Sequence, residues 1–226
     1  MSIQSLRIRQ LKEWLQKLRN LLDSDLVDLV PRLWSAVKQL FREEKPPGPY
    51  EVLAYESRLE LKDAKGKKAV FYKRQRVRFL QDNVIAFQDL AWGDGQIFAD
   101  YQCAPGVAVD RYREGHRYRV LISLRETKNQ GDVEEFLIER TIQDGFTRTV
   151  ESFQTEINHP TQQLSVSVVF PRQRPPQRVT LTQQNAAKTA ELGADRRRVL
   201  PDGRVKVFWE AHNPGLYEAY ILQWTW

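Results

Sequence analysis

The first 45 residues carry hydrophobic side chains at helical spacing. Leucines in the first part step by four, three and four positions, as one apolar face of a helix over residues 4–23 requires. A second apolar stripe follows Asp28, which is a good N-cap residue, and Pro31 then falls in the first turn, where proline is tolerated. The pattern predicts a helical hairpin. The leucines of the first stripe are Leu11, Leu15, Leu18 and Leu22.

The helical pattern ends at a short run of proline and glycine. Residues 46–49 read Pro-Pro-Gly-Pro, which cannot continue a helix and favours an extended spacer. This run is the clearest boundary in the chain. We therefore expect an N-terminal helical hairpin or adaptor at 1–45, a linker at 46–49 and a second domain at 50–226.

From residue 50 onward, polar and apolar residues alternate, which is typical of half-buried strands. Two long runs flank residues 63–68 and predict a hairpin. Because no helical pattern intervenes, we expect a mainly β fold: an antiparallel β-sandwich or barrel of about ten strands. The expected strands cover residues 51–61, 69–80, 83–91, 96–102, 116–125, 133–142, 147–157, 163–170, 178–183, 204–210 and 216–226.

The last of these runs is rich in large side chains. Tyr220, Leu222, Trp224 and Trp226 share one face at alternate positions. Such side chains contribute large burial energies, so we interpret this stripe as sandwich core and not as a ligand-binding surface.

Composition sets the broad class. The 226 residues include 35 Lys+Arg and 29 Asp+Glu, a formal net charge of +6, with 41% hydrophobic residues. These values are those of a globular protein, and no apolar run is long enough for a membrane-spanning helix. The first residues lack a signal-peptide pattern, and the single cysteine, Cys103, fits a reducing compartment. We expect a cytoplasmic protein.

The sequence contains no recognisable catalytic or metal-binding motif. No spacing places any of the three histidines beside Cys103, and no glycine-rich phosphate loop follows a strand. Asp89, Asp94 and Asp100 bracket a glycine turn but lack the spacing of a calcium loop. We therefore predict a protein that is not an enzyme and that has neither a metal nor another cofactor.

Arginines at alternate positions suggest a weak anion-binding surface. If the two runs that carry them were adjacent strands, they would form one basic face. The alternative is a solvated face on which the arginines pair with glutamates. Nucleic acid is not favoured as a partner, because the aromatic side chains lie on the opposite faces. The candidate residues are Arg74, Arg76, Arg78, Arg117 and Arg119.

The N-terminal stripes expose more apolar surface than two helices can bury against each other. This surface can dock on the β domain, bind a protein partner or bind a membrane surface, for which the flanking basic residues are suited. The predicted partner-binding residues are Leu11, Trp14, Leu15, Leu18, Leu33, Trp34, Val37 and Phe41.

The layout of a short helical segment before a β-rich body resembles that of small proteins of bacterial conflict (defence) systems. This resemblance covers the whole chain and has no diagnostic residues. Our leading hypothesis is a non-enzymatic protein-interaction module, in which the helices bind a partner and the sandwich is a recognition or scaffold body. The alternatives are a membrane-active effector that uses its amphipathic helices, and a protein that binds nucleic acid or another anion through the arginines.

Overall fold

The computed structural model describes residues 48–226, and most of this part is β-strand. The mainly β, sandwich-like prediction is therefore confirmed. The predicted helical hairpin at 1–45 lies outside the described residues. No helix in the described part is long and apolar enough to cross a membrane.

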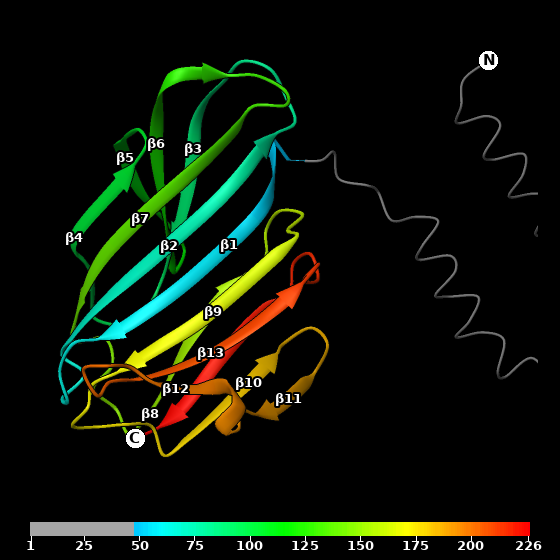
Figure 1. Ribbon diagram of the computed structural model, residues 1–226. Helices are drawn as coiled ribbons and strands as arrows, with labels where there is room; N and C mark the ends of the chain where they lie inside the picture. Colours follow the sequence, from blue (N-terminus) through cyan, green and yellow to red (C-terminus); the bar gives the residue numbers. More distant parts are fainter. Residues whose placement is uncertain (1–47) are drawn as a thin grey trace, which may run out of the picture. The chain divides into compact units, whose positions relative to one another are not determined.

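One layer of the sandwich is a seven-stranded sheet with the strand order β12-β13-β9-β1-β2-β7-β4 (Figure 1). Its central strands β1 and β2 are long and are joined by a hairpin. The strands are β1 (Tyr50–Leu61), β2 (Lys68–Phe79), β4 (Gln96–Ala104), β7 (Val133–Gln143), β9 (Gln163–Phe170), β12 (Arg197–Val199) and β13 (Val205–His212).

The second layer is divided into two smaller sheets. One has the order β3-β6-β5 and the other β11-β10-β14-β8, and Figure 1 places them at opposite ends of the large sheet. Consequently β3 and β8 are both edge strands. The strands are β3 (Val84–Ala91), β5 (Val107–Glu114), β6 (Arg117–Lys128), β8 (Val150–Glu156), β10 (Arg178–Gln183), β11 (Lys188–Glu191) and β14 (Ala219–Thr225); a short 3-10 helix, η1, spans Ala194–Arg196.

Alternation along the strands creates two hydrophobic cores. In β2, for example, every second residue from Phe71 to Phe79 is buried, and the residues between them face outward. The core under the four-stranded sheet includes Leu59, Val168, Leu222, Trp224 and Trp226, whereas the core under the three-stranded sheet includes Val77, Phe87, Ile122 and Phe136. The C-terminal aromatic stripe is thus core, as predicted.

The hairpin between β1 and β2 follows from its turn residues. The Asp63 carboxylate accepts hydrogen bonds from the backbone N–H groups of Lys65, at 2.7 Å, and Lys68, at 2.6 Å. Gly66 has φ +69, and a Cβ there would collide with the carbonyl oxygen of Phe146. An aspartate and a glycine at these positions therefore favour the tight turn that sets the β1–β2 register.

Two details of the predicted β domain were wrong. The described residues contain fourteen strands instead of about ten, and the sheets are not wholly antiparallel, because β1 pairs with β9 in parallel. The extra strands β5, β11 and β12 were missed because β5 and β11 are exposed along their whole length and β12 has only three residues, so none shows alternation. Arg197 and Arg198 begin β12.

Candidate functional site

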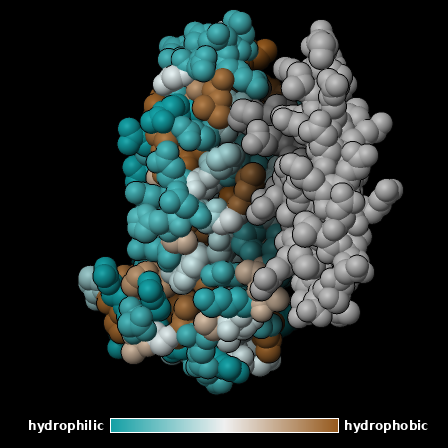
Figure 2. Space-filling view, turned by 90° about the vertical axis from the view of Figure 1, so that its right-hand side faces the viewer, coloured by the Kyte–Doolittle hydropathy of each residue, from teal (hydrophilic) through white to brown (hydrophobic). Residues whose placement is uncertain are grey.

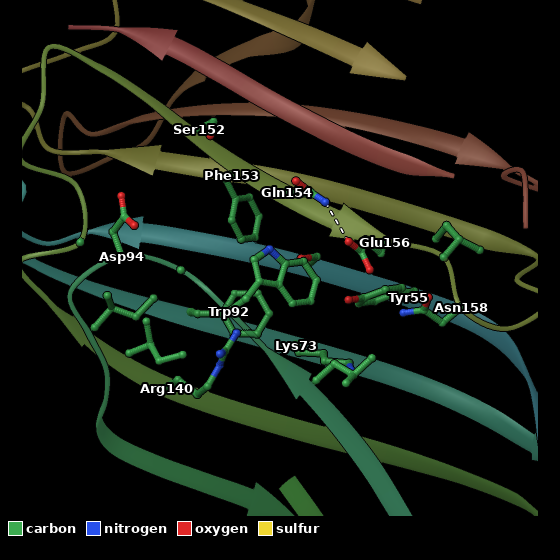
Figure 3. A pocket seen from close by; sticks show the side chains of 18 of the residues that line it. Tyr55, Lys73, Trp92, Asp94, Arg140, Ser152, Phe153, Gln154, Glu156 and Asn158 are labelled. Carbon is green, nitrogen blue, oxygen red and sulfur yellow. Dashed lines mark hydrogen bonds between the residues drawn. The ribbon is translucent and has the colours of Figure 1, made fainter. Parts of the chain in front are cut away.

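A cavity of about 340 Å³ lies where the second layer is divided (Figure 3). The inner face of β1, β2 and β7 supplies residues such as Tyr55, Lys73 and Arg140 on one side. On the other side, β8 and the turn that follows β3 supply residues such as Phe153 and Trp92. This volume is within the range of pockets that hold small molecules.

Buried polar side chains from both layers lie between the two hydrophobic cores. We call this group the polar belt. Ser57 and Lys73 are direct partners in the β1–β2 register, and Arg140 is the partner of Phe71 in the β2–β7 register. The polar belt consists of Ser57, Lys73, Gln75, Asp89, Arg140 and Thr155, all of them buried.

Lys73 and Asp89 form a complete ion pair in the polar belt. The Lys73 Nζ atom donates to Asp89 Oδ1 at 2.9 Å, and the Tyr101 hydroxyl donates to Asp89 Oδ2 at 3.3 Å. Burial acts to lower the pKa of Lys73, but the adjacent Asp89 carboxylate outweighs it and raises that pKa above its ordinary value. Both carboxylate oxygens of Asp89 are thus occupied.

Arg140 is buried but lacks such a partner. Only 6% of the residue is exposed, and neither Nε nor Nη1 has a hydrogen-bond partner. Its guanidinium lies over the ring of Phe71, 4.3 Å from the ring centroid, and among residues 48–226 Arg140 forms no ion pair. Burial lowers the pKa of Arg140, although arginine stays protonated in proteins. The belt therefore holds two cations and one anion, so one positive charge is uncompensated.

The opposite side of the cavity is held by an ion pair between the two smaller sheets. Arg117 on β6 donates from Nη1 and Nη2 to the Glu156 carboxylate on β8, at 2.6 and 2.7 Å. The Arg117 guanidinium also lies over the ring of Trp92, 5.1 Å from its centroid. In Figure 3, Trp92 is drawn between Phe153 and Arg140. This bidentate pair positions the indole beside the cavity.

Two further titratable groups line the cavity. Glu151 on β8 is buried and accepts a hydrogen bond from the backbone N–H of Arg148 at 2.7 Å; burial raises its pKa, and the nearby Asp94 charge adds to this effect. The His159 ring lies against the Tyr50 ring at a tilt of 34°, with ring centroids 4.2 Å apart. Burial, with a smaller contribution from Lys73, lowers the pKa of His159 to about 4. The imidazole is therefore neutral at pH 7.

The predicted arginine face is not assembled. Arg74, Arg76 and Arg78 lie on β2 in the large sheet, whereas Arg117 and Arg119 lie on β6 in the three-stranded sheet, so the two runs are not adjacent strands. Four of these arginines contact carboxylates, as the alternative interpretation expects: Arg74 with Glu135, Arg78 with Glu51, Arg117 with Glu156 and Arg119 with Glu114. Figure 2 shows hydrophobic side chains in small patches among hydrophilic ones on the described part of one face.

The other candidate chemistry is also accounted for. Burial raises the pKa of the Cys103 thiol, the opposite of an activated thiolate. Asp94 pairs with Arg148 at 2.9 Å, and residues 48–226 contain no group of three or more side chains suited to hold a metal ion. None of these contacts tests whether the protein is an enzyme. The predicted partner-binding residues, from Leu11 to Phe41, lie outside the described residues.

Sequence reasoning missed Arg140 and Lys73, although both leave a signal. Each is a charged residue at an inward, otherwise apolar position of an alternating strand: Arg140 follows Phe136 and Ile138, and Lys73 follows Phe71. A charge at such a position predicts either a buried partner or a ligand.

The comparisons with known proteins found likeness only among solved structures. No protein-family model and no curated protein matches the sequence. A "putative protease" from Parabacteroides distasonis is similar over 80% of this chain and 41% of its own, with 10% identity and a TM-score of 0.47. An M1 zinc metallopeptidase from Deinococcus radiodurans is similar over 77% of this chain and 42% of its own, with 8% identity and a TM-score of 0.48.

Our leading hypothesis, a non-enzymatic interaction module, finds no support among these neighbours, which are named as peptidases. It is not kept, and neither are its membrane and arginine-based alternatives. The chain spans less than half the length of either neighbour. At such TM-scores and identities, the likeness does not carry the activity of the neighbours over to this chain.

Proposed function

We propose that the β domain binds a small molecule with a carboxylate group in the cavity between its two layers. The observation that carries this proposal is the buried guanidinium of Arg140, which lines the cavity and has Nε and Nη1 without partners. A buried charge without a counter-ion is costly, and such a group in a cavity is a candidate functional residue. A ligand carboxylate would supply the missing negative charge and accept hydrogen bonds from the guanidinium.

The rest of the cavity suits an organic acid better than a bare inorganic anion. Trp92, Phe153 and Ile142 provide apolar and aromatic surface near the polar belt. Small-molecule sites typically combine such surface with a few polar groups that fix orientation. The Lys73–Asp89 pair is already complete, so the expected specificity rests on Arg140.

Calorimetric titration of the full chain tests this function. Hexanoate and phenylacetate are compared with their neutral amides, using the wild type and Arg140→Met. We expect both acids to bind, the amides to bind more weakly, and Arg140→Met to weaken acid binding at least about tenfold, the usual effect of losing a charge-assisted hydrogen bond.

Arg78→Met is the matched control, because Arg78 lies on the outer face of the same sheet and contacts Glu51 at 2.9 Å. It should bind the acids like the wild type. The proposal is wrong if neither acid binds at about 10 mM, or if acids and amides bind equally well. It is equally wrong if a folded Arg140→Met protein retains full affinity.

A further inference from the structure

The cavity contains a second charge without an opposite partner, and this charge is negative. Glu151 faces inward from β8 and is 8% exposed. Its carboxylate accepts the Arg148 N–H, whereas the Arg148 side chain pairs with Asp94 at 2.9 Å. Among residues 48–226, Glu151 forms no ion pair with a basic side chain. It is therefore a buried anion that borders the same space as Arg140.

Glu151 and Arg140 do not compensate each other. Arg140 lies on β7 in the seven-stranded sheet, and Glu151 lies on β8 in the opposite layer. In the described part of the chain, no ion pair and no hydrogen bond joins these two side chains. They thus line one cavity from opposing walls.

The other acidic group on that wall is already used. Both oxygens of Glu156 accept hydrogen bonds from Arg117. Of the two acidic side chains on β8, only Glu151 is thus left without a basic side chain within the described residues and can bind a cationic group of a ligand. A ligand that satisfies both walls needs opposite charges at its two ends.

We propose that the ligand is a dipolar molecule, with a carboxylate that binds Arg140 and an ammonium group that binds Glu151. Amino acids whose carboxylate and ammonium group are joined by a chain of several carbons belong to this class. This inference rests on the proposed function, because it assumes that Arg140 binds a carboxylate. Packed β layers lie about 10 Å apart, and side chains from both walls shorten the gap, so we expect the two ligand charges to be separated by several bonds.

A series of ω-amino acids with four, six and eight carbons tests whether the ligand is dipolar and measures the preferred distance between its two charges. Each is titrated into the full chain beside the carboxylate and the primary amine of equal length. We expect one of the amino acids to bind about tenfold more tightly than its carboxylate, and the amines to bind weakest.

Glu151→Gln separates this inference from the proposed function. The glutamine carbonyl can still accept the Arg148 N–H, so the variant keeps the local hydrogen bond while losing the charge. It should remove the tenfold preference for the amino acid and leave carboxylate affinity unchanged. Glu126→Gln, a change at a side chain that is 83% exposed, is the control and should behave like the wild type.

Two results would overturn the inference, and they differ in what they leave standing. If carboxylates bind through Arg140 but no amino acid binds more tightly, or if Glu151→Gln keeps the preference, the dipolar class is wrong and the carboxylate site stands. If nothing in the series binds the wild type, the carboxylate site fails together with the inference.

Discussion

On the outer face of the seven-stranded sheet, Arg78 lies 2.9 Å from the carboxylate of Glu51 on the neighbouring strand, and the two side chains are 45% and 24% exposed. On the inner face of the same sheet, Arg140 is buried without an anion, while Lys73 beside it has Asp89. The same kind of charge is thus paired where water would have screened it and left unpaired where water is excluded. Fold stability alone would favour the reverse arrangement, which suggests that Arg140 serves binding.

Removing the paired inner cation, Lys73, should change the free energy of unfolding more than any other substitution considered below. Lys73→Met leaves the buried Asp89 carboxylate without its counter-ion, so we expect a loss of about 3–5 kcal/mol in the free energy of unfolding. Urea denaturation of the full chain, followed by circular dichroism, measures it. The double variant Lys73→Met/Asp89→Asn should recover most of the loss; a single variant that costs nothing would contradict the pairing.

Removing the unpaired inner cation, Arg140, should raise the free energy of unfolding instead of lowering it. Arg140→Met takes away a buried charge that has no ion-pair partner and keeps an apolar side chain against Phe71. We expect the ligand-free protein to gain about 1–2 kcal/mol, as when buried charges are replaced by apolar residues of similar volume. Thermal unfolding without ligand measures the gain. A destabilisation similar to that of Lys73→Met would mean that the protein itself compensates Arg140.

Much of the difference between the inner and outer faces could be predicted from the alternation of residues within single strands. Alternation in the sequence placed Phe71, Val77 and Phe79 inward, and the buried pattern of β2 agrees. The same alternation assigns Lys73 and Arg140 to the inner face. The chemistry-bearing residues were therefore visible in the sequence as exceptions to the apolar face.

The assembly of the site could not be predicted in the same way. It depends on the parallel pairing of β1 with β9 and on a second layer that is divided between β3 and β8. These are contacts between segments far apart in the chain, and no local propensity encodes them. For the same reason the sequence could not decide whether the arginines of β2 and β6 lie on adjacent strands; they lie in different sheets.

A smaller effect is expected from His159, at the edge of the inner face. Its pKa of about 4 in the folded protein lies below the ordinary value of 6.5, so the unfolded chain binds the proton first as the pH falls. The stabilisation is complete above pH 6.5 and is lost between pH 6.5 and 4. The full difference is about 3 kcal/mol, and solvent screening of this half-buried ring reduces it to about 1 kcal/mol.

Melting temperatures between pH 7.5 and 4.5 test this dependence. His159→Gln should flatten the curve relative to the wild type, whereas His212→Gln, a change at an exposed residue, should not. Identical slopes in the wild type and His159→Gln would show that the imidazole titrates normally.

The smallest effect is expected on the outer face. Arg78→Met removes an ion pair whose arginine side chain is 45% exposed, and pairs of this kind contribute about 0.5 kcal/mol or less. A double-mutant cycle with Glu51→Gln, measured by urea denaturation at low and high salt, gives the coupling energy. We expect it to shrink with salt, because exposed charges are screened. A salt-independent coupling as large as that of Lys73 with Asp89 would remove the distinction between the two faces, and with it the argument that Arg140 is exceptional.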